Sequence, residues 1–153
     1  MKKLTAIIAM SMCLMVSVFG EQPEPCDTAA EATVRFAPVH IYLDCGQRFL
    51  AAFQFELKAV AGEIKIVGVE GGEHPAFVEP PYYDRAALAN DRIIIGAFNT
   101  GSDLPTGRTR VATVHLQIIG DVEPEYGLVL TVAADADGSE IPAEITFEKG
   151  EQI

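Results

Sequence analysis

The sequence predicts an all-β fold, an antiparallel β-sandwich of jelly-roll type with about 7 to 9 strands. Three observations lead to this prediction. Apolar residues alternate with polar ones at every second position in several short runs, which is the period of a strand with one buried face. Turn-forming residues separate these runs at intervals of about 8 to 12 positions. No run has the length and spacing of an amphipathic helix.

The segment from Leu50 to Gly72 carries the clearest strand pattern. Its first half alternates two kinds of side chain, which places them on opposite faces of one strand. The apolar positions are Phe53, Phe55 and Leu57, and the polar positions are Gln54, Glu56 and Lys58. After a short corner at residues 59–62, a second strand begins at Ile64 and ends at a pair of glycines. We expect the apolar set to lie in the core.

Two other runs predict strands with special positions in the sheets. Residues 33–43 are strand-like but contain Pro38, which lacks a backbone N–H and therefore confines this strand to a sheet edge or a bulge. Residues 92–98 form a β-branched, nearly continuous apolar run. Such a run is typical of a strand that is covered on both faces.

The remaining segments are assigned from weaker patterns. Residues 73–91 have no clear period, with one helical turn expected at 84–89 behind Asp84 as its N-cap. Residues 111–118, 127–134 and 141–147 predict three more strands. In the first of these, Val114 and Leu116 point inward and His115 points outward. Asp137-Gly138 is a hairpin signal.

The chain divides into three parts. Residues 1–20 have two lysines, an apolar stretch and small residues before a predicted cleavage after Gly20, which is the pattern of a signal peptide. Residues 21–32 form an acidic, proline-containing extended leader, and residues 33–153 form the sandwich domain. The apolar stretch is shorter than the roughly 20 residues that span a bilayer, so we expect a secreted or extracytoplasmic protein without membrane insertion after cleavage.

Charge and cysteine content limit the partners and the compartment. A formal net charge of −11 repels nucleic acid and anionic lipid, and we expect neither as a partner. The exported chain keeps Cys26 and Cys45, and an oxidising compartment favours a disulfide between them. Two unpaired thiols, or a bridge between two chains, are the alternatives.

Few residues suggest chemistry. His40, His74 and His115 lack metal-ligand spacing, and no catalytic motif occurs, so we expect no enzyme. Three carboxylates around Gly138 could bind Ca²⁺, although we favour a plain Asp-Gly turn: Asp135, Asp137 and Glu140. Tyr82 and Tyr83 could stack on a sugar or pack against the core. Apart from this Ca²⁺ candidate, we expect no cofactor.

Several motifs, in order along the chain, resemble cohesin modules. These motifs are Phe53-x-Phe55 followed by a bend and Gly68-Val69-Glu70, then residues 92–95 (RIII), Gly107 with residues 111–114 (VATV), and residues 134–142 (ADADGSEIP). The resemblance implies a nine-strand jelly-roll sandwich. It also implies a non-catalytic module that binds a protein, either a dockerin-like domain or a cell-surface component.

The resemblance also implies where binding occurs. Type I cohesins present an asparagine and an aspartate to dockerin from the outward face of their third strand, and Ala52 and Gln54 stand at the matching positions. Ala52 and Gln54 are therefore candidate binding residues, and we add Glu56 on the same side of this strand and Tyr82 and Tyr83, whose rings could stack on a sugar. The alternative function is a carbohydrate-binding module of the same fold superfamily, associated with polysaccharide degradation, whose ligand is a glycan.

Overall fold

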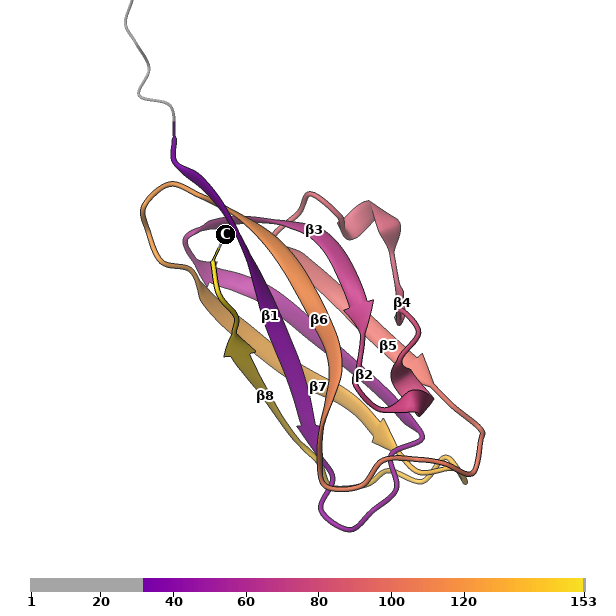
Figure 1. Ribbon diagram of the computed structural model, residues 1–153. Helices are drawn as coiled ribbons and strands as arrows, with labels where there is room; N and C mark the ends of the chain where they lie inside the picture. The colour runs from indigo at the N-terminus through magenta and orange to yellow at the C-terminus, as the bar shows by residue number, and fades with distance from the viewer. Residues whose placement is uncertain (1–31, 153) are drawn as a thin grey trace, which may run out of the picture. The chain divides into compact units, whose positions relative to one another are not determined.

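Residues 32–152, the part of the chain that the computed structural model describes, form eight β-strands and two short 3-10 helices (Figure 1). The strands are β1 (Val34–Asp44), β2 (Ala52–Ala61), β3 (Glu63–Gly71), β4 (Tyr82–Tyr83), β5 (Arg92–Phe98), β6 (Arg108–Ile119), β7 (Glu125–Ala134) and β8 (Glu144–Lys149). The helices are η1 (Pro75–Phe77) and η2 (Arg85–Ala87).

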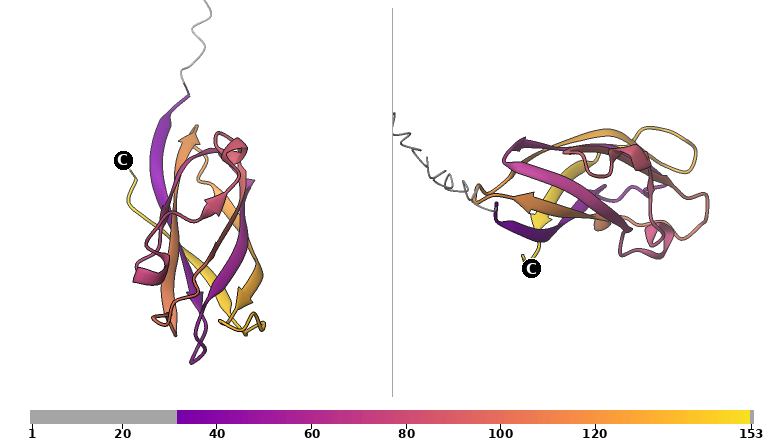
Figure 2. Two further views of the ribbon diagram at one scale, coloured as in Figure 1. Left: turned by 90° about the vertical axis from the view of Figure 1, so that its right-hand side faces the viewer. Right: turned by 90° about the horizontal axis from the view of Figure 1, so that it is seen from above.

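The strands form two four-stranded sheets that pack face to face. Sheet A has the order β3-β6-β1-β8, and sheet B has the order β4-β5-β2-β7. All strand pairs are antiparallel, and every connection except that from β4 to β5 crosses between the sheets. Sheet A is the front layer in Figure 1, and Figure 2 shows the two layers from other directions. The predicted antiparallel β-sandwich is confirmed.

The core lies between the sheets and is built from alternate residues of their strands. Phe53 and Phe55 of β2 are 2% and 0% exposed, and the Phe53 ring meets Phe77 edge to face with centroids 5.1 Å apart. The inward predictions are confirmed for Phe53, Phe55, Leu57, Val114 and Leu116, and the outward ones for Gln54, Glu56 and His115. The period-2 pattern therefore assigned the faces of β2 and β6 correctly.

A glycine makes the corner between β2 and β3. Gly62 has a φ of +78°, a conformation that L-residues with a side chain rarely adopt. A Cβ atom there would also lie 2.9 Å from Cα of Pro124. The corner lets the chain leave sheet B and begin sheet A within one residue.

Both 3-10 helices begin at a side chain that accepts a backbone hydrogen bond. Asp84 Oδ1 accepts from the N–H of Ala86 at 2.9 Å, which confirms the predicted N-cap and helical turn. His74 Nδ1 accepts from the N–H of Ala76 at 3.2 Å at the start of η1.

The prediction that Pro38 confines its strand to an edge or a bulge is wrong. β1 is an interior strand, paired with β6 along its length and with β8 from Val39 onward, and its bulge lies at Ile41/Tyr42. The carbonyl of Pro38 accepts from the N–H of Gly150, so the backbone of Pro38 points to the side where β8 has ended. The missing N–H therefore costs no ladder bond.

The prediction that residues 92–98 are covered on both faces is also wrong. Ile93 and Ile95 are buried at 1% and 0% exposure, but Ile94 is 47% exposed and Phe98 is 65% exposed. None of the described residues covers the outer side of β5. The continuous apolar run thus combines one core face with one apolar surface face.

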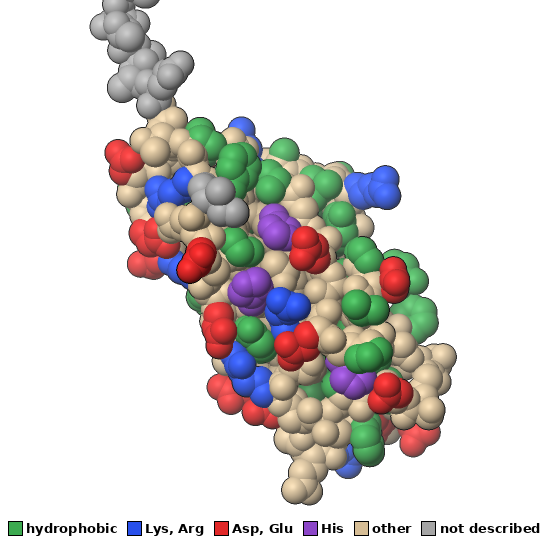
Figure 3. All heavy atoms as spheres, viewed as in Figure 1, with side chains coloured by type: hydrophobic (Ala, Val, Ile, Leu, Met, Phe, Trp, Pro, Cys, Tyr) green, Lys and Arg blue, Asp and Glu red, His purple; other side chains and the backbone are tan. Residues whose placement is uncertain are grey.

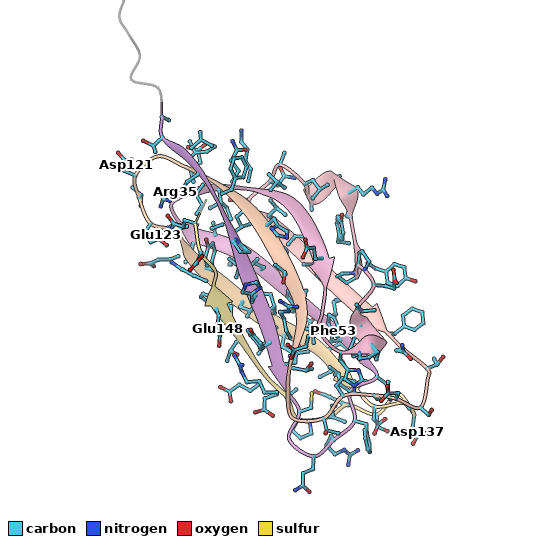
Figure 4. All side chains as sticks on the ribbon, in the orientation of Figure 1. Arg35, Phe53, Asp121, Glu123, Asp137 and Glu148 are labelled. Carbon is cyan, nitrogen blue, oxygen red and sulfur yellow. The ribbon has the colours of Figure 1, made fainter. Side chains whose placement is uncertain are left out.

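A cluster of ion pairs lies at the end of the sandwich where β1 begins (Figure 4). Glu123 lies 3.0 Å from Arg35 and 2.8 Å from Lys149, measured between the charged atoms. Lys149 also lies over the ring of Tyr126, and that ring meets Phe147 edge to face. Burial, aided by the negative charge of Glu123, raises the pKa of Tyr126 to about 12.

Some predictions fall on residues outside the described part, namely the signal peptide, residues 21–31 of the leader, and Cys26. The disulfide therefore stays a prediction. Cys45 is 4% exposed, and no disulfide joins it to another described residue. Within residues 32–152, no helix is long and apolar enough to cross a membrane.

Candidate functional site

The outer face of sheet B presents four rows of side chains across its strands. Each row is set by one outward residue of β2 and by its partners on the neighbouring strands. From one end to the other, the rows are Phe98, Ala52 and Ala134; Tyr82, Gly96, Gln54 and Val132; Ile94, Glu56 and Val129; and Arg92, Lys58 and Gly127.

Apolar side chains dominate this face although it is open to solvent. The exposed fractions are 71% for Tyr82, 65% for Phe98, 51% for Val129, 47% for Ile94 and 42% for Val132. Single exposed apolar residues are normal, but a contiguous group of them marks an interaction surface. We call these five residues the apolar patch.

Two aromatic rings flank a hollow in the apolar patch. The rings of Tyr82 and Phe98 are parallel to within 11°, with centroids 5.9 Å apart. Gly96 lies opposite Tyr82 in the ladder and has no side chain, which leaves a hollow of about 450 Å³ between the rings and Gln54. A Cβ atom on Gly96 would lie 3.2 Å from the carbonyl oxygen of Phe53, so the hollow reaches down to the backbone.

The polar side chains of this face are already paired with one another. Gln54 donates to the Thr131 hydroxyl at 3.2 Å, and that hydroxyl donates to the Gln54 carbonyl at 3.0 Å. The Arg92 guanidinium donates to Glu56 at 2.6 Å, and this hydrogen bond lowers the pKa of the Glu56 carboxyl. Lys58 makes no ion pair with any described residue. The apolar patch is thus bordered by a charged row at the Lys58 end.

The structure brings four of the five predicted binding residues together on this face. Ala52, Gln54 and Glu56 share the outer side of β2, and Tyr82 stands two strands away in the same row as Gln54. Tyr83 alternates with Tyr82, is half-buried and packs against the core. The two tyrosines therefore form no common platform.

The opposite outer face, on sheet A, combines charged and polar pairs with three exposed apolar side chains, those of Val34, Phe36 and Val67. Arg108 pairs with Glu148 at 2.7 Å and lies over the Tyr42 ring, and His115 lies 3.1 Å from Glu70. His40 hydrogen-bonds the Thr113 hydroxyl at 3.0 Å. Figure 3 shows this face, where acidic, basic and histidine side chains are interspersed with hydrophobic ones. The outer face of sheet A thus carries more charged side chains, and the outer face of sheet B carries more exposed apolar ones.

The calcium candidate is a turn between β7 and β8, which lie in different sheets, so the β-hairpin expected at Asp137-Gly138 is wrong. One oxygen of Asp135 accepts from the backbone N–H groups of Asp137 and Ser139, and its other oxygen accepts from Arg48 at 2.9 Å. These bonds, the Ser139 one foremost, lower the pKa of Asp135. Residues 32–152 hold no cluster of three or more His, Cys, Asp or Glu side chains suited to a metal ion.

Sequence reasoning missed the residues that make up most of the apolar patch. Ile94 and Phe98 were assigned to a covered strand, and the outward positions of β7 could not be assigned because Thr131 forms a bulge that shifts the alternation. The available signal was the strand 92–98 itself, which is apolar at positions that period 2 places on both faces.

Comparisons of the chain with protein-family models, with curated proteins and with solved structures found no match.

Proposed function

We propose that this chain is a secreted, non-catalytic binding module that engages another protein through the outer face of sheet B. The observation that carries the proposal is the apolar patch, because five exposed apolar side chains lie on the outer face of sheet B, whereas the opposite face carries several charged pairs and fewer exposed apolar side chains. Burying such a patch against a partner is favourable by about 25 cal/mol for each Å² of apolar surface removed from water.

The size of the face suits a modest protein interface. Seven residues of β2 span about 20 Å and four strands span about 19 Å, which gives roughly 400 Å² in projection. This projection covers the whole face, charged row included, and is smaller than the contribution of one partner to a standard interface. A partner that binds reversibly fits this area.

The order of the rows indicates the chemistry of the partner. The aromatic and aliphatic rows receive apolar side chains, with one of them seated in the hollow over Gly96. At the other end Lys58 is free of an ion pair within the described residues and receives a carboxylate. This face carries Arg92, Lys58 and Glu56, so it is the part of an acidic protein that an acidic partner can approach.

The resemblance to cohesin modules supports the same face. In that family the outward face of one strand contacts the partner protein, and the matching residues here, Ala52 and Gln54, lie on the outer side of β2 in the middle of the apolar patch. The partner is then a dockerin-like domain or a cell-surface protein.

A glycan is the second candidate for this face, because parallel exposed rings such as Tyr82 and Phe98 can stack on a sugar. Two features favour a protein. The aliphatic side chains of Ile94, Val129 and Val132 offer no hydrogen bonds to hydroxyl groups. The amide of Gln54, the polar group at the hollow, is already bonded to Thr131.

Variants on opposite faces test the proposal. Ile94→Asp places a charge in the apolar patch, and Val67→Asp places one on β3, at a site with nearly the same exposure of 46%. The exported protein and both variants are used to capture proteins from the extracellular fraction of the source organism. We expect one protein to bind the parent and Val67→Asp and to be lost with Ile94→Asp.

Three results would contradict the proposal. A protein lost equally with both variants would point to another surface or to general destabilisation, which circular dichroism distinguishes. Retention of an insoluble polysaccharide by the parent, with loss in Ile94→Asp and no bound protein, would assign the face to a glycan. A captured protein that still binds Ile94→Asp would show that the outer face of sheet B is not the binding surface.

A further inference from the structure

Three loops meet at the end of the sandwich opposite the Glu123 cluster. They are the β1–β2 loop, the β5–β6 loop and the turn after β7, which come together at the lower end of Figure 1. Backbone hydrogen bonds tie the first two loops: Leu50 donates to the carbonyl of Pro105 at 2.9 Å, and Gly107 donates to that of Gly46 at 2.6 Å. The N–H of Ala51 donates to the carbonyl of Ala134 at 2.8 Å, which joins the first loop to the end of β7. The loop end is therefore held in one shape.

These loops line an open pocket of about 500 Å³, a volume within the range of small-molecule sites. Two apolar side chains line it, Phe49 from the first loop and Leu104 from the second. Phe49 is 59% exposed in the loop between β1 and β2. The pocket thus offers an apolar wall that is open to a ligand.

The polar groups of the pocket include both donors and acceptors of hydrogen bonds. Arg48 uses one nitrogen to hold Asp135 at 2.9 Å, which fixes the guanidinium and leaves its other N–H groups available. Ser102 supplies a hydroxyl. Asp137 lines the same pocket, and its carboxylate accepts no hydrogen bond from the described residues. Figure 4 labels Asp137 at this end, far from Arg35 and Glu123.

We propose that this pocket binds a neutral sugar, as a single ring or a chain end. A pyranose presents an apolar face of C–H groups beside hydroxyls that both donate and accept, which matches the Phe49 and Leu104 wall, the Arg48 donors and the Asp137 acceptor. The site is separate from the apolar patch of sheet B, so the sugar and a protein partner use different surfaces of the module.

The charges of the pocket discriminate against ions. An anion would meet the carboxylates of Asp135 and Asp137, and the single guanidinium of Arg48 is already compensated by Asp135. A simple cation would pair with Asp137 but would offer no acceptor to the free N–H groups of Arg48. A neutral ligand with many hydroxyls meets no like charge and uses the donors and acceptors of all three polar side chains.

NMR with named disaccharides tests the proposal on the folded, ¹⁵N-labelled protein. Lactose, maltose, cellobiose and mannobiose are the neutral probes, and digalacturonate is the anionic control. We expect saturation transfer to at least one neutral probe, with amide shifts confined to residues 47–49, 101–104 and 135–137. Phe49→Ala and Asp137→Asn should each weaken binding about tenfold, the loss of one ring contact or one charged hydrogen bond.

Ile94→Asp is the matched control, since it alters the apolar patch and should leave sugar binding unchanged. Phe49 and Asp137 are exposed, and unchanged amide shifts outside the pocket confirm that their variants fold. Absence of saturation transfer from all four neutral probes would overturn the proposal. Equal binding of digalacturonate, or shifts centred on β2 and β5 that disappear in Ile94→Asp, would overturn it as well.

Discussion

The rings of Tyr82 and Phe98 lie parallel to within 11° and 5.9 Å apart on the outer face of sheet B, at one end of the apolar patch. They come from neighbouring strands, and Gly96 between them carries no side chain. This pair is the most exposed part of the patch, at 71% and 65%. Two aromatic rings held together in water, and not turned into the core, indicate a surface that is shaped for contact.

Truncation of a side chain should lower the stability of the fold much more on the inner face of sheet B than on its outer face. Phe55→Ala removes a fully buried ring and should lower the free energy of unfolding by about 3 to 5 kcal/mol. Ile94→Ala, on the adjacent strand but 47% exposed, should cost less than about 1 kcal/mol. Urea titration of both variants measures the difference. Equal losses would mean that the face assignment of β2 and β5 is wrong.

The corner at Gly62 should tolerate a methyl group worse than the turn at Gly138. Both residues have positive φ, +78° and +77°, so Gly→Ala carries a similar strain of about 1 kcal/mol at either site. Only at Gly62 would the new Cβ approach a backbone atom, Cα of Pro124, to 2.9 Å, whereas nothing lies within 4 Å at Gly138. The midpoint temperature of thermal unfolding should be well lower for Gly62→Ala than for Gly138→Ala. Equal midpoints would show that the β2–β3 corner relaxes freely.

Tyr126 should make the fold sensitive to alkali. Because burial raises the pKa of its hydroxyl in the folded protein to about 12, above the usual value of about 10, the native state favours the neutral form. The resulting stabilisation is complete below pH 10 and is lost as the pH rises towards 12. Absorbance at the tyrosinate band should show one late phase, absent in Tyr126→Phe. A phase that Tyr126→Phe removes near pH 10, with the fold intact by circular dichroism, would refute the assignment.

Cys45 should react slowly while the protein is folded. Burial, and then the negative charge of Asp44, raise the pKa of the thiol, and thiolate is the reactive form. A bridge from Cys26 is also demanding in length. Cys45 lies eleven residues beyond Val34, about 36 Å along extended chain, whereas the eight residues from Cys26 to Val34 reach at most about 29 Å and a disulfide adds up to about 7 Å between Cα atoms.

The two lengths are about equal, at about 36 Å each, so the disulfide expected from the cysteine count stays a prediction. Iodoacetamide followed by mass spectrometry tests it, because a free Cys45 thiol would be labelled slowly in buffer and rapidly in urea. Absence of labelling in urea without a reductant, together with a mass lower by two hydrogen atoms, would establish the disulfide.

The alternation of β2 and β6 predicted the sandwich and its core because each strand has one buried face and an uninterrupted alternation of side chains over Phe53–Leu57 and Val114–Leu116. The position of Pro38 in an interior strand could not be predicted, because the end of β8 depends on long-range pairing. The apolar patch was not predictable for the same reason. Gln54 and Tyr82 are 28 positions apart in the sequence and come into one row only because both pair with β5. An apolar run in the sequence also does not indicate whether both faces of the strand are covered.

Photo-crosslinking from the apolar patch tests the central claim most directly. Benzoylphenylalanine is introduced at position 94 on sheet B and, as the matched control, at position 67 on sheet A, two sites with exposed fractions of 47% and 46%. Irradiation in the extracellular fraction should yield one discrete protein adduct from position 94 and none from position 67, and unlabelled parent protein should compete with it. The same adducts from both positions, or an adduct from position 67 alone, would contradict the assignment of sheet B as the docking face.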